Sequence, residues 1–245
     1  LGETHFALGD WDKAIDSFQQ SLNLAEQAGQ RKATSRVFSV LGDIYRIRGR
    51  WTAADECYQL ALSALTATGN PQSQFHINLS LGLMNMERSR YAKAQEHLDK
   101  CWNITSKGFG FTSRMALVRS YLGELALRVG ELSTAQAHAD EAVLLAQEAG
   151  VRQELAHATM VKGMIAIEQQ NWDTALQHCA QAQETFEALS DKYNTGRIHA
   201  VVGQLYLARN QEPQDRSRAL EHFTQAKEVF VQLEAKTELE KLPAL

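Results

Sequence analysis

Four histidines recur at one register of the sequence and are the first candidates for chemistry. His97, His138 and His178 stand 41 and 40 residues apart in succession, and His222 follows at a shifted spacing. Imidazoles that converge on one point could hold zinc, whose bonds to nitrogen are about 2 Å long. Residues one repeat apart, however, would lie on successive packed helices about 8–10 Å apart. The spacing therefore favours a half-exposed polar ring in each repeat, and we predict no metal and no cofactor.

Nucleophiles and acid–base groups show no catalytic arrangement. Cys57, Cys101 and Cys179 are odd in number and widely spaced, which argues against a disulfide framework and suits a reducing cytoplasm. Cys101 and Cys179 stand at packing registers and are expected in the core. A catalytic thiol needs a base held beside it, and no motif supplies one. No Ser/His/Asp set, HExxH pattern or carboxylate pair stands out, so we predict that the protein is not an enzyme.

One basic concentration occurs, between residues 31 and 50. It could receive an acidic peptide or a phosphate, but a solvated helix face with local ion pairs is the favoured interpretation. Nucleic acid is not expected as a partner, because the net charge is -4 and no aromatic residues interleave with the arginines. The basic residues are Arg31, Lys32, Arg36, Arg46, Arg48 and Arg50.

The loop from Asn103 to Thr112 contains two glycines, Gly108 and Gly110, but it is not predicted to bind phosphate. No strand precedes it and its spacing does not fit a phosphate-binding loop. We interpret it as a long connection between repeats, with Phe109 and Phe111 tucked against the neighbouring helices. If these rings were exposed, they would form a second contact site.

The elements that must position these residues are set by an internal repeat. A glycine recurs at intervals of 40, 40, 41, 40 and 40 residues, namely Gly2, Gly42, Gly82, Gly123, Gly163 and Gly203. Alanine follows it by twelve residues, at Ala14, Ala54, Ala94, Ala135 and Ala175, and in the sixth unit at Ala219 after an insertion. Small residues also follow at Ser21, Ala61, Cys101, Ala142, Ala182 and Ala226. A larger residue stands between the two small positions in most units, as at Phe18, Tyr58, Leu98 and Phe223. Small residues at fixed places allow two helices to approach closely, so we predict nested helices.

Each unit also carries helix breaks. Seven residues after the repeat glycine comes a position suited to a left-handed helix end, occupied by Gly9, Gly49, Ser89, Gly130, Gln170 and Asn210. A second break is predicted near Gly29, Gly69, Gly110, Gly150 and Ser190. Predicted N-caps of the second helix are Asp12, Thr52, Ser133, Asp173 and Ser217. Each unit therefore reads as helix A, a tight turn, helix B and a short loop.

This pattern resembles the tetratricopeptide repeat, and the best match is Leu41-Gly42…Tyr45…Ala54…Tyr58…Ala61. The period of 40 residues exceeds the 34 of the usual repeat, and the closing proline is missing. The longer variety is similar to arrays in bacterial signalling proteins, among them transcription regulators, STAND-type ATPases, kinases, cyclases and quorum-sensing peptide receptors. It is also similar to the Leu-Gly-Asn scaffolds of animal cells.

The resemblance implies an all-α, right-handed α-α superhelix with about five full hairpins and a leading partial one. We expect one array over residues 1–245, with units of approximately 1–29, 30–69, 70–110, 111–150, 151–190 and 191–241. The last helix is predicted from Ser217 to Lys241, with a polar end that caps the array. Because the chain starts inside a motif, we expect it to be a fragment of a larger protein. No apolar run reaches the ~18–20 residues that a membrane helix needs, so no membrane is expected.

In the tetratricopeptide family, helix A lines the concave face and binds partners. The resemblance therefore implies a partner-binding surface made of Arg36, Ser39, Asp43, Arg46, His76, Leu79, Leu83, Met86, Glu87, Ser120, Glu124, Leu127, Arg128, His157, Met160, Met164, Glu168, Arg197 and Gln204. Its apolar members could instead pack within the groove. We expect a protein–protein interaction module that binds a peptide or partner segment there. The alternative is a sensor or regulatory arm of a larger bacterial signalling protein. Exposed end faces could also pair two copies as a homodimer.

Overall fold

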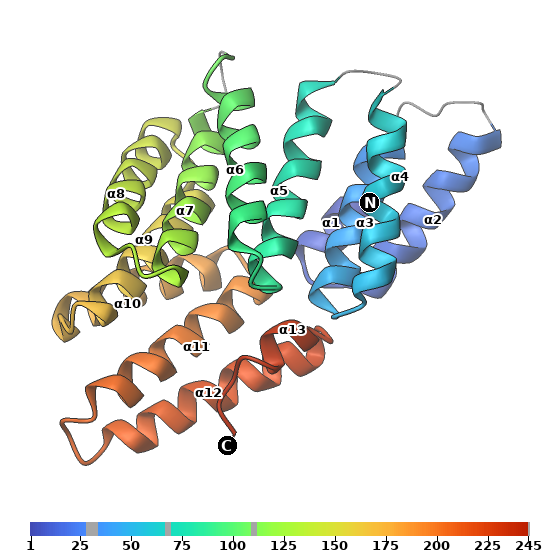
Figure 1. Ribbon diagram of the computed structural model, residues 1–245. Coiled ribbons are helices and arrows are strands. Elements are labelled where there is room, and N and C mark those ends of the chain that lie inside the picture. Colours follow the sequence, from blue (N-terminus) through green and yellow to red (C-terminus); the bar gives the residue numbers. More distant parts are fainter. Residues whose placement is uncertain (28–33, 67–69, 109–111, 245) are drawn as a thin grey trace. The chain divides into compact units, whose positions relative to one another are not determined.

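The computed structural model describes residues 1–27, 34–66, 70–108 and 112–244, and within these ranges it contains helices and no strand (Figure 1). The all-α fold class is thereby confirmed, with five long hairpins and a leading pair whose first helix has only 6 residues. The helices are α1 (Gly2–Ala7), α2 (Trp11–Gln27), α3 (Thr34–Ile47), α4 (Trp51–Thr66), α5 (Pro71–Glu87), α6 (Tyr91–Thr105), α7 (Thr112–Arg128), α8 (Leu132–Ala149), α9 (Arg152–Glu168), α10 (Trp172–Ala188), α11 (Lys192–Arg209), α12 (Asp215–Gln232) and α13 (Lys236–Leu239).

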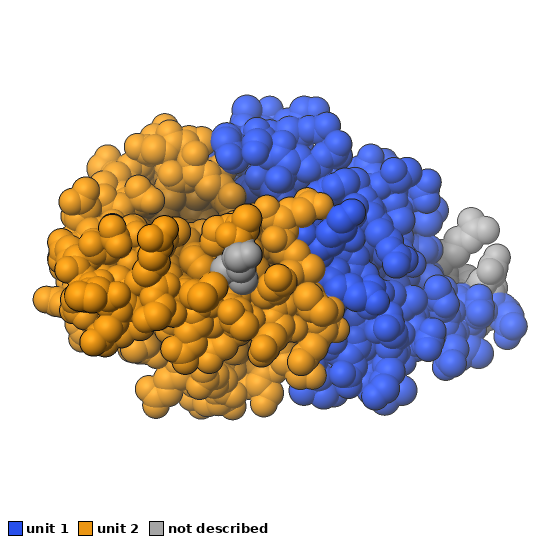
Figure 2. All heavy atoms as spheres, turned by 90° about the horizontal axis from the view of Figure 1, so that it is seen from below, with its two compact units in different colours: residues 1–107, 233–237 blue, residues 108–232, 238–245 orange. Residues whose placement is uncertain are grey.

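The chain divides into two compact units, coloured separately in Figure 2. Unit 1 comprises Leu1–Lys107 and Leu233–Thr237, and unit 2 comprises Gly108–Gln232 and Glu238–Leu245. Within the units, each helix A packs against its own helix B, as in α3 with α4 and α11 with α12. The proposed repeat boundaries and the single continuous array stay predictions. None of the described helices combines the length and hydropathy that crossing a bilayer requires.

The nesting of helices around the repeat glycines is confirmed. A Cβ on Gly203 would lie 2.6 Å from a ring carbon of Phe223, and one on Gly163 would lie 2.8 Å from the Cys179 sulfur. Since real Cβ atoms do not approach that closely, helix A touches helix B through the bare backbone of glycine. All six alanines that follow the glycine are buried, and of the second set of small residues only Ser21 is exposed.

The left-handed helix ends are found where the sequence places them. Gly9, Gly49 and Gly130 have positive φ, and so do Ser89, Gln170 and Asn210 at the same register. At the second break, Gly150 and Ser190 also have positive φ. The equivalent Gly29, Gly69 and Gly110 lie outside the described residues.

The predicted N-caps of helix B are wrong by about two residues. α8 and α10 start at the apolar residue itself, so that Glu131 and Asn171 take their N-cap positions, and neither side chain caps its helix. The reason is the tightness of the turn. The residue after Gly130 donates its N–H to Ala126 O at 2.8 Å, and its own carbonyl accepts from Ala135 N at 2.9 Å. One residue thus closes helix A and opens helix B.

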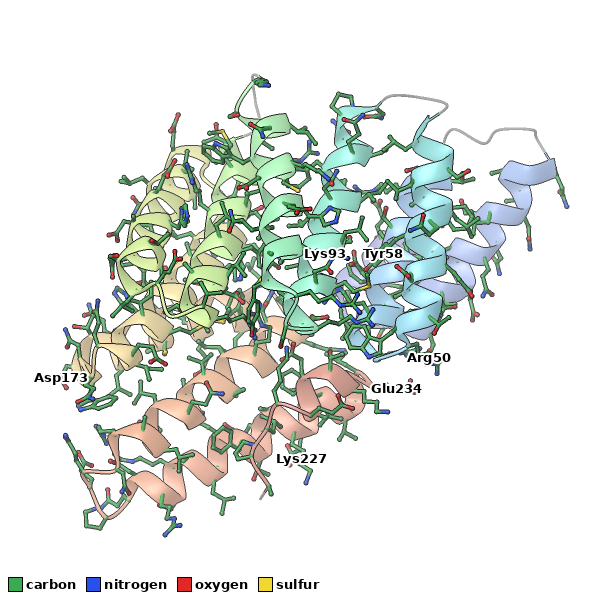
Figure 3. All side chains as sticks on the ribbon, in the orientation of Figure 1. Arg50, Tyr58, Lys93, Asp173, Lys227 and Glu234 are labelled. Carbon is green, nitrogen blue, oxygen red and sulfur yellow. The ribbon has the colours of Figure 1, made fainter. Side chains whose placement is uncertain are left out.

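The prediction of one helix from Ser217 to Lys241 is also wrong. α12 begins at Asp215 and ends at Gln232, and Glu234 has φ 50°, which breaks the helix before the short α13. Leu233 and Ala235 are buried. Glu234 between them is exposed, and Figure 3 labels it beside α13. Burial of these two apolar side chains overrides the helix propensity of the charged residues around them.

Candidate partner-binding surface

The A helices form one wall of each unit, called here the inner wall. Within the units, helix A contacts the helix A of the next hairpin, α3 with α5 and α9 with both α7 and α11. Among the described residues, no two B helices are in contact to that extent. Helices that lie closer together are on the inside of a curved stack, so the A helices line the concave side of each unit.

In unit 1, a polar chain runs across three successive A helices. Arg36 on α3 pairs with Glu3 on α1, and its Nη1 lies 2.7 Å from His76 Nε2 on α5. Because a guanidinium only donates, His76 Nε2 must be the acceptor, which places the imidazole proton on Nδ1. Two of the predicted site residues are therefore joined across 40 positions of sequence.

A second polar group in unit 1 is centred on Asp43. Its Oδ1 accepts from the Tyr58 hydroxyl at 2.9 Å, and its Oδ2 accepts from Ser80 Oγ at 3.0 Å. Arg46 lies beside Asp43 and also pairs with Glu87 on α5. Burial raises the pKa of Asp43 above its ordinary value, outweighing the opposite effects of Arg46, Tyr58 and Ser80. Tyr58 lies among the helices of unit 1 (Figure 3), where this network ties helix B to two A helices.

The apolar predicted residues of unit 1 differ in exposure. Leu79 and Leu83 on α5 are half-buried, whereas Met86 is 3% exposed. Ser39 is buried and donates to Ser35 O within its own helix. The inner wall of unit 1 thus offers parts of two leucines beside the exposed Arg36.

In unit 2, the inner wall contains a buried ion cluster that spans three A helices. Glu124 on α7 accepts from Arg197 Nη2 on α11 at 2.8 and 2.9 Å and lies 2.7 Å from His157 Nε2 on α9. Burial alone would raise the pKa of Glu124, but the charges of Arg197 and Arg128 and the hydrogen bond from His157 hold it well below its usual range. Glu124 is therefore an ionised carboxylate that joins the three helices.

The other predicted residues of unit 2 fall into three groups. Ser120 and Met160 are buried, with both side chains 0% exposed. Leu127 and Met164 are half-buried. The exposed members are Arg128, Glu168 and Gln204.

A pocket of about 90 Å³ opens on this wall of unit 2. Arg128, Met164, Arg197 and Gln204 line it from three A helices. Ala200 and Val201 complete the helical part, and the other side is formed by the chain's end, through Glu238, Lys241 and Leu242.

Sequence reasoning missed the contribution of the chain's end. Glu238 is buried and accepts from the Tyr193 hydroxyl at 2.9 Å, yet both residues lay outside the predicted surface. A single helix over residues 217–241 would have continued past the inner wall, so the sequence analysis did not place this segment there. Leu233, Glu234 and Ala235 are all helix-forming residue types, so no local signal in the sequence marks this break.

The described part of the basic concentration in residues 31–50 is largely engaged in ion pairs, as the favoured interpretation expects, but Arg46 and Arg48 are buried and do not belong to a solvated face. Besides the pairs of Arg36 and Arg46, Arg48 lies 2.8 Å from Asp12 and 3.3 Å from Glu234, all within unit 1. Arg50 is exposed, and Arg31 and Lys32 lie outside the described residues. The phenylalanines of the glycine-containing loop, Phe109 and Phe111, also lie outside them.

The histidines on the B helices face helix A of their own hairpin. His97 Nδ1 lies 3.0 Å from Asn78 Oδ1, and His222 Nδ1 lies 3.0 Å from His199 Nδ1. Burial lowers the pKa of His97, His178 and His222. In the described ranges, no three His, Cys, Asp or Glu side chains gather as metal ligands would.

The cysteines are thiols in packed surroundings. Cys101 and Cys179 are buried, and burial raises the pKa of each thiol to about 12. Cys57 is half-buried, and burial together with Glu56 raises its pKa to about 11. Since the thiolate is the nucleophile, these pKa values describe poorly reactive side chains.

Comparison with known proteins agrees with this architecture. The family model described as Tetratricopeptide repeat matches residues 1–67. No curated protein matches the chain in sequence.

Several solved structures share the fold. A Rap protein complexed with Competence and Sporulation Factor has a TM-score of 0.71 at 14% identity, over 98% of this chain and 71% of that one. BtubC from P. vanneervenii has a TM-score of 0.59 at 16% identity, over 98% and 94%. The STAND protein with a tetratricopeptide repeat sensor from Pyrococcus horikoshii has a TM-score of 0.57 at 13% identity, over 96% of this chain and 38% of that one. At such identities the likeness concerns the fold alone.

Proposed function

We propose that this chain, which carries tetratricopeptide repeats, binds a segment of a partner polypeptide along the inner wall of its units. Tetratricopeptide repeats generally mediate protein–protein interactions, and scaffolds of this type are typically non-catalytic. The observation that carries the proposal is the composition of the wall. Half-buried Leu79, Leu83, Leu127 and Met164 stand beside exposed charged side chains on helices that line a concave side.

This wall suits a partner because its shape is fixed in advance. The ion pairs between A helices hold the backbone and the buried charges in place, so little conformational entropy is lost on binding. The partly exposed leucines and Met164 supply apolar area, and methionine adapts to varied side chains. Charged groups such as Arg36, Arg128 and Glu168 would set register and orientation.

The predicted surface then divides by role. We assign partner contact to its exposed and half-buried members. The buried ones, Ser39, Arg46, Met86, Ser120, Glu124, His157 and Met160, would hold the wall in shape.

Capture of partners from the native host by the immobilised full chain tests the proposal. Arg36→Glu and Met164→Glu should each reduce the captured partner about tenfold, because they place a carboxylate at the wall. Leu144→Glu and Lys227→Glu are matched controls on exposed sites of B helices and should leave capture unchanged. Circular dichroism verifies the fold of each variant. A partner retained equally by all four variants would mean that the inner wall is not the binding surface.

A sensor role is the second candidate, supported by the structural likeness to the tetratricopeptide repeat sensor of the STAND protein. In that role, occupancy of the inner wall would regulate another domain. Reading the parent gene on both sides of this chain tests it. A nucleotide-binding, kinase, cyclase or DNA-binding domain in the same open reading frame is the expected result, and a gene that encodes only further repeats would count against it.

A further inference from the structure

Two imidazoles meet between α11 and α12, which pack side by side as one hairpin of unit 2 (Figure 1). His199 Nδ1 lies 3.0 Å from His222 Nδ1, and the two ring centroids are 5.3 Å apart. The centroid distance is nearly the sum of the contact between the nitrogens and the two distances from nitrogen to ring centre. The nitrogens therefore point straight at each other, as the donor and the acceptor of an N–H···N hydrogen bond do.

Only one proton can stand between these two nitrogens. A neutral imidazole has one N–H and one acceptor nitrogen, so in the neutral pair one Nδ1 donates and the other accepts. A first added proton goes to Nε2 of the donor ring and leaves the bond intact. A second added proton finds only the accepting Nδ1. It would set two N–H groups and two positive charges against each other, so the doubly protonated pair cannot keep this bond.

The same register of unit 1 holds a pair without this limit. His97 Nδ1 lies 3.0 Å from Asn78 Oδ1, and the amide nitrogen of Asn78 donates to Gln74 O. An amide oxygen only accepts, so His97 Nδ1 carries a proton whether the ring is neutral or charged. Asn78 and His199 each stand four residues before the repeat glycine. Titration therefore leaves the bond of unit 1 in place and breaks its counterpart in unit 2.

Burial opposes a positive charge on either ring of the pair. Burial, and after it the charge of His222, lowers the pKa of His199, and burial also lowers the pKa of His222. Two carboxylates act in the opposite direction, Glu187 of α10 on His199 and Glu221 of α12 on His222. Both carboxylates are exposed, so water screens their charges.

An aromatic ring and two guanidinium groups complete the surroundings of the pair. Tyr206 of α11 stacks on His222, with the ring centroids 5.8 Å apart. Arg209 and Arg218 lie over the Tyr206 ring, at 5.2 and 5.6 Å from its centroid, and both guanidinium groups also have carboxylate partners. Tyr206 thus shields one face of His222 from water, which adds to the cost of a positive charge there.

We propose that His199 and His222 form a pH-sensitive contact between α11 and α12, closed while the two rings share one proton and opened in mild acid when both rings are protonated. Because the folded protein takes up these protons less readily than the unfolded chain, the stability from this contact is full above the unfolded histidine pKa of ~6.5. It is lost as the pH falls from there through the lower folded pKa values. α11 also carries Arg197, which reaches Glu124, so opening would loosen the inner wall of unit 2.

Nitrogen NMR of the wild-type full chain with ¹⁵N-labelled histidine tests the closed state. At about pH 7.5, a scalar coupling across the hydrogen bond should connect the Nδ1 resonances of His199 and His222, one of a protonated nitrogen and one of an unprotonated nitrogen. By about pH 5 the coupling should be gone, with both nitrogens protonated. Absence of the coupling at the higher pH would disprove the shared proton, and its persistence at the lower pH would disprove the opening.

Hydrogen exchange, corrected for the intrinsic rate at each pH, tests the effect on the hairpin. Between about pH 7.5 and pH 5, the amides of α11 and α12 should lose at least about tenfold of their protection in the wild type, since each unit of pKa difference between folded and unfolded states is a factor of ten. His199→Asn gives this hairpin the imidazole–amide pair of unit 1 and should lose no more than about threefold, because one imidazole titrates there in place of two.

The matched control is His97→Gln, which changes the histidine at the same register of unit 1. Protection of α11 and α12 in this control should fall as steeply as in the wild type. Equal losses in the wild type and His199→Asn, or no loss in the wild type, would overturn the proposal.

Discussion

Charged side chains on the inner wall are paired with one another across hairpins. Arg197 reaches Glu124 across 73 positions of sequence, and Arg36 and Arg46 each reach the following A helix in unit 1. Breaking a buried pair by removing one partner is costly, because the other charge is left without compensation. At the scale of single residues, these charges thus stabilise the wall on which a ligand would rest.

Glu124→Gln should therefore lower the free energy of unfolding at pH 7 by about 3 kcal/mol. The pKa of Glu124 is lower in the folded than in the unfolded state, so its contribution is full above the unfolded pKa of ~4.3 and is lost as the pH falls below it. Urea unfolding between pH 7 and pH 3 should show the gap between wild type and variant narrowing below about pH 4.3. Glu168→Gln, at an exposed site of α9, should change stability by less than about 0.5 kcal/mol. A gap that is independent of pH would contradict the role of Glu124.

At the scale of elements, the turn between helix A and helix B begins with a left-handed residue at the same register in every hairpin, although the turn from α11 to α12 is longer than the others. The left-handed residue is glycine in three units, but Ser89, Gln170 and Asn210 in the others. A residue with a Cβ pays a steric penalty of ~1–2 kcal/mol in this conformation, whereas glycine avoids it at an entropic cost of ~0.5–1 kcal/mol.

Gln170→Gly should consequently stabilise unit 2 by about 0.5–1 kcal/mol and raise its Tm by about 1–4 °C. The matched control is Gln169→Gly at the neighbouring position, where φ is −79° and glycine brings only its entropic cost. That control should lower the Tm in differential scanning calorimetry. A decrease for both variants would show that the side chain of Gln170 has a stabilising contact of its own.

At the scale of the whole molecule, each unit has its own core. In unit 1, Ile77 packs in one cluster with Ala54, Tyr58 and Ala61. In unit 2, Leu205 packs with Cys179, Phe186 and Ile198. The side chains of Ile77 and Leu205 are both 0% exposed, so truncating either one to alanine leaves a cavity.

Ile77→Ala and Leu205→Ala should each cost about 2–5 kcal/mol, and the effect should be confined to one unit. In repeat proteins each hairpin is stabilised mainly by its contacts with the neighbouring hairpins, so the loss of stability caused by one substitution is largest near that substitution. Hydrogen exchange should show loss of amide protection in α3–α6 for the first variant and in α9–α12 for the second. Equal loss in both units from either variant would mean that the chain unfolds as one cooperative body.

The sequence by itself determined the hairpins, since their signals are local. Glycine is required where helix A touches Phe223 or Cys179 of helix B, and a left-handed residue is required at a fixed distance after it. Both requirements act within one hairpin, so they recur in the sequence with the period of the repeat. The pairings across hairpins, the end of α12 and the seat of Glu238 were decided only by the tertiary structure. Each depends on which side chains from distant positions are desolvated together, and a linear pattern contains no record of that burial.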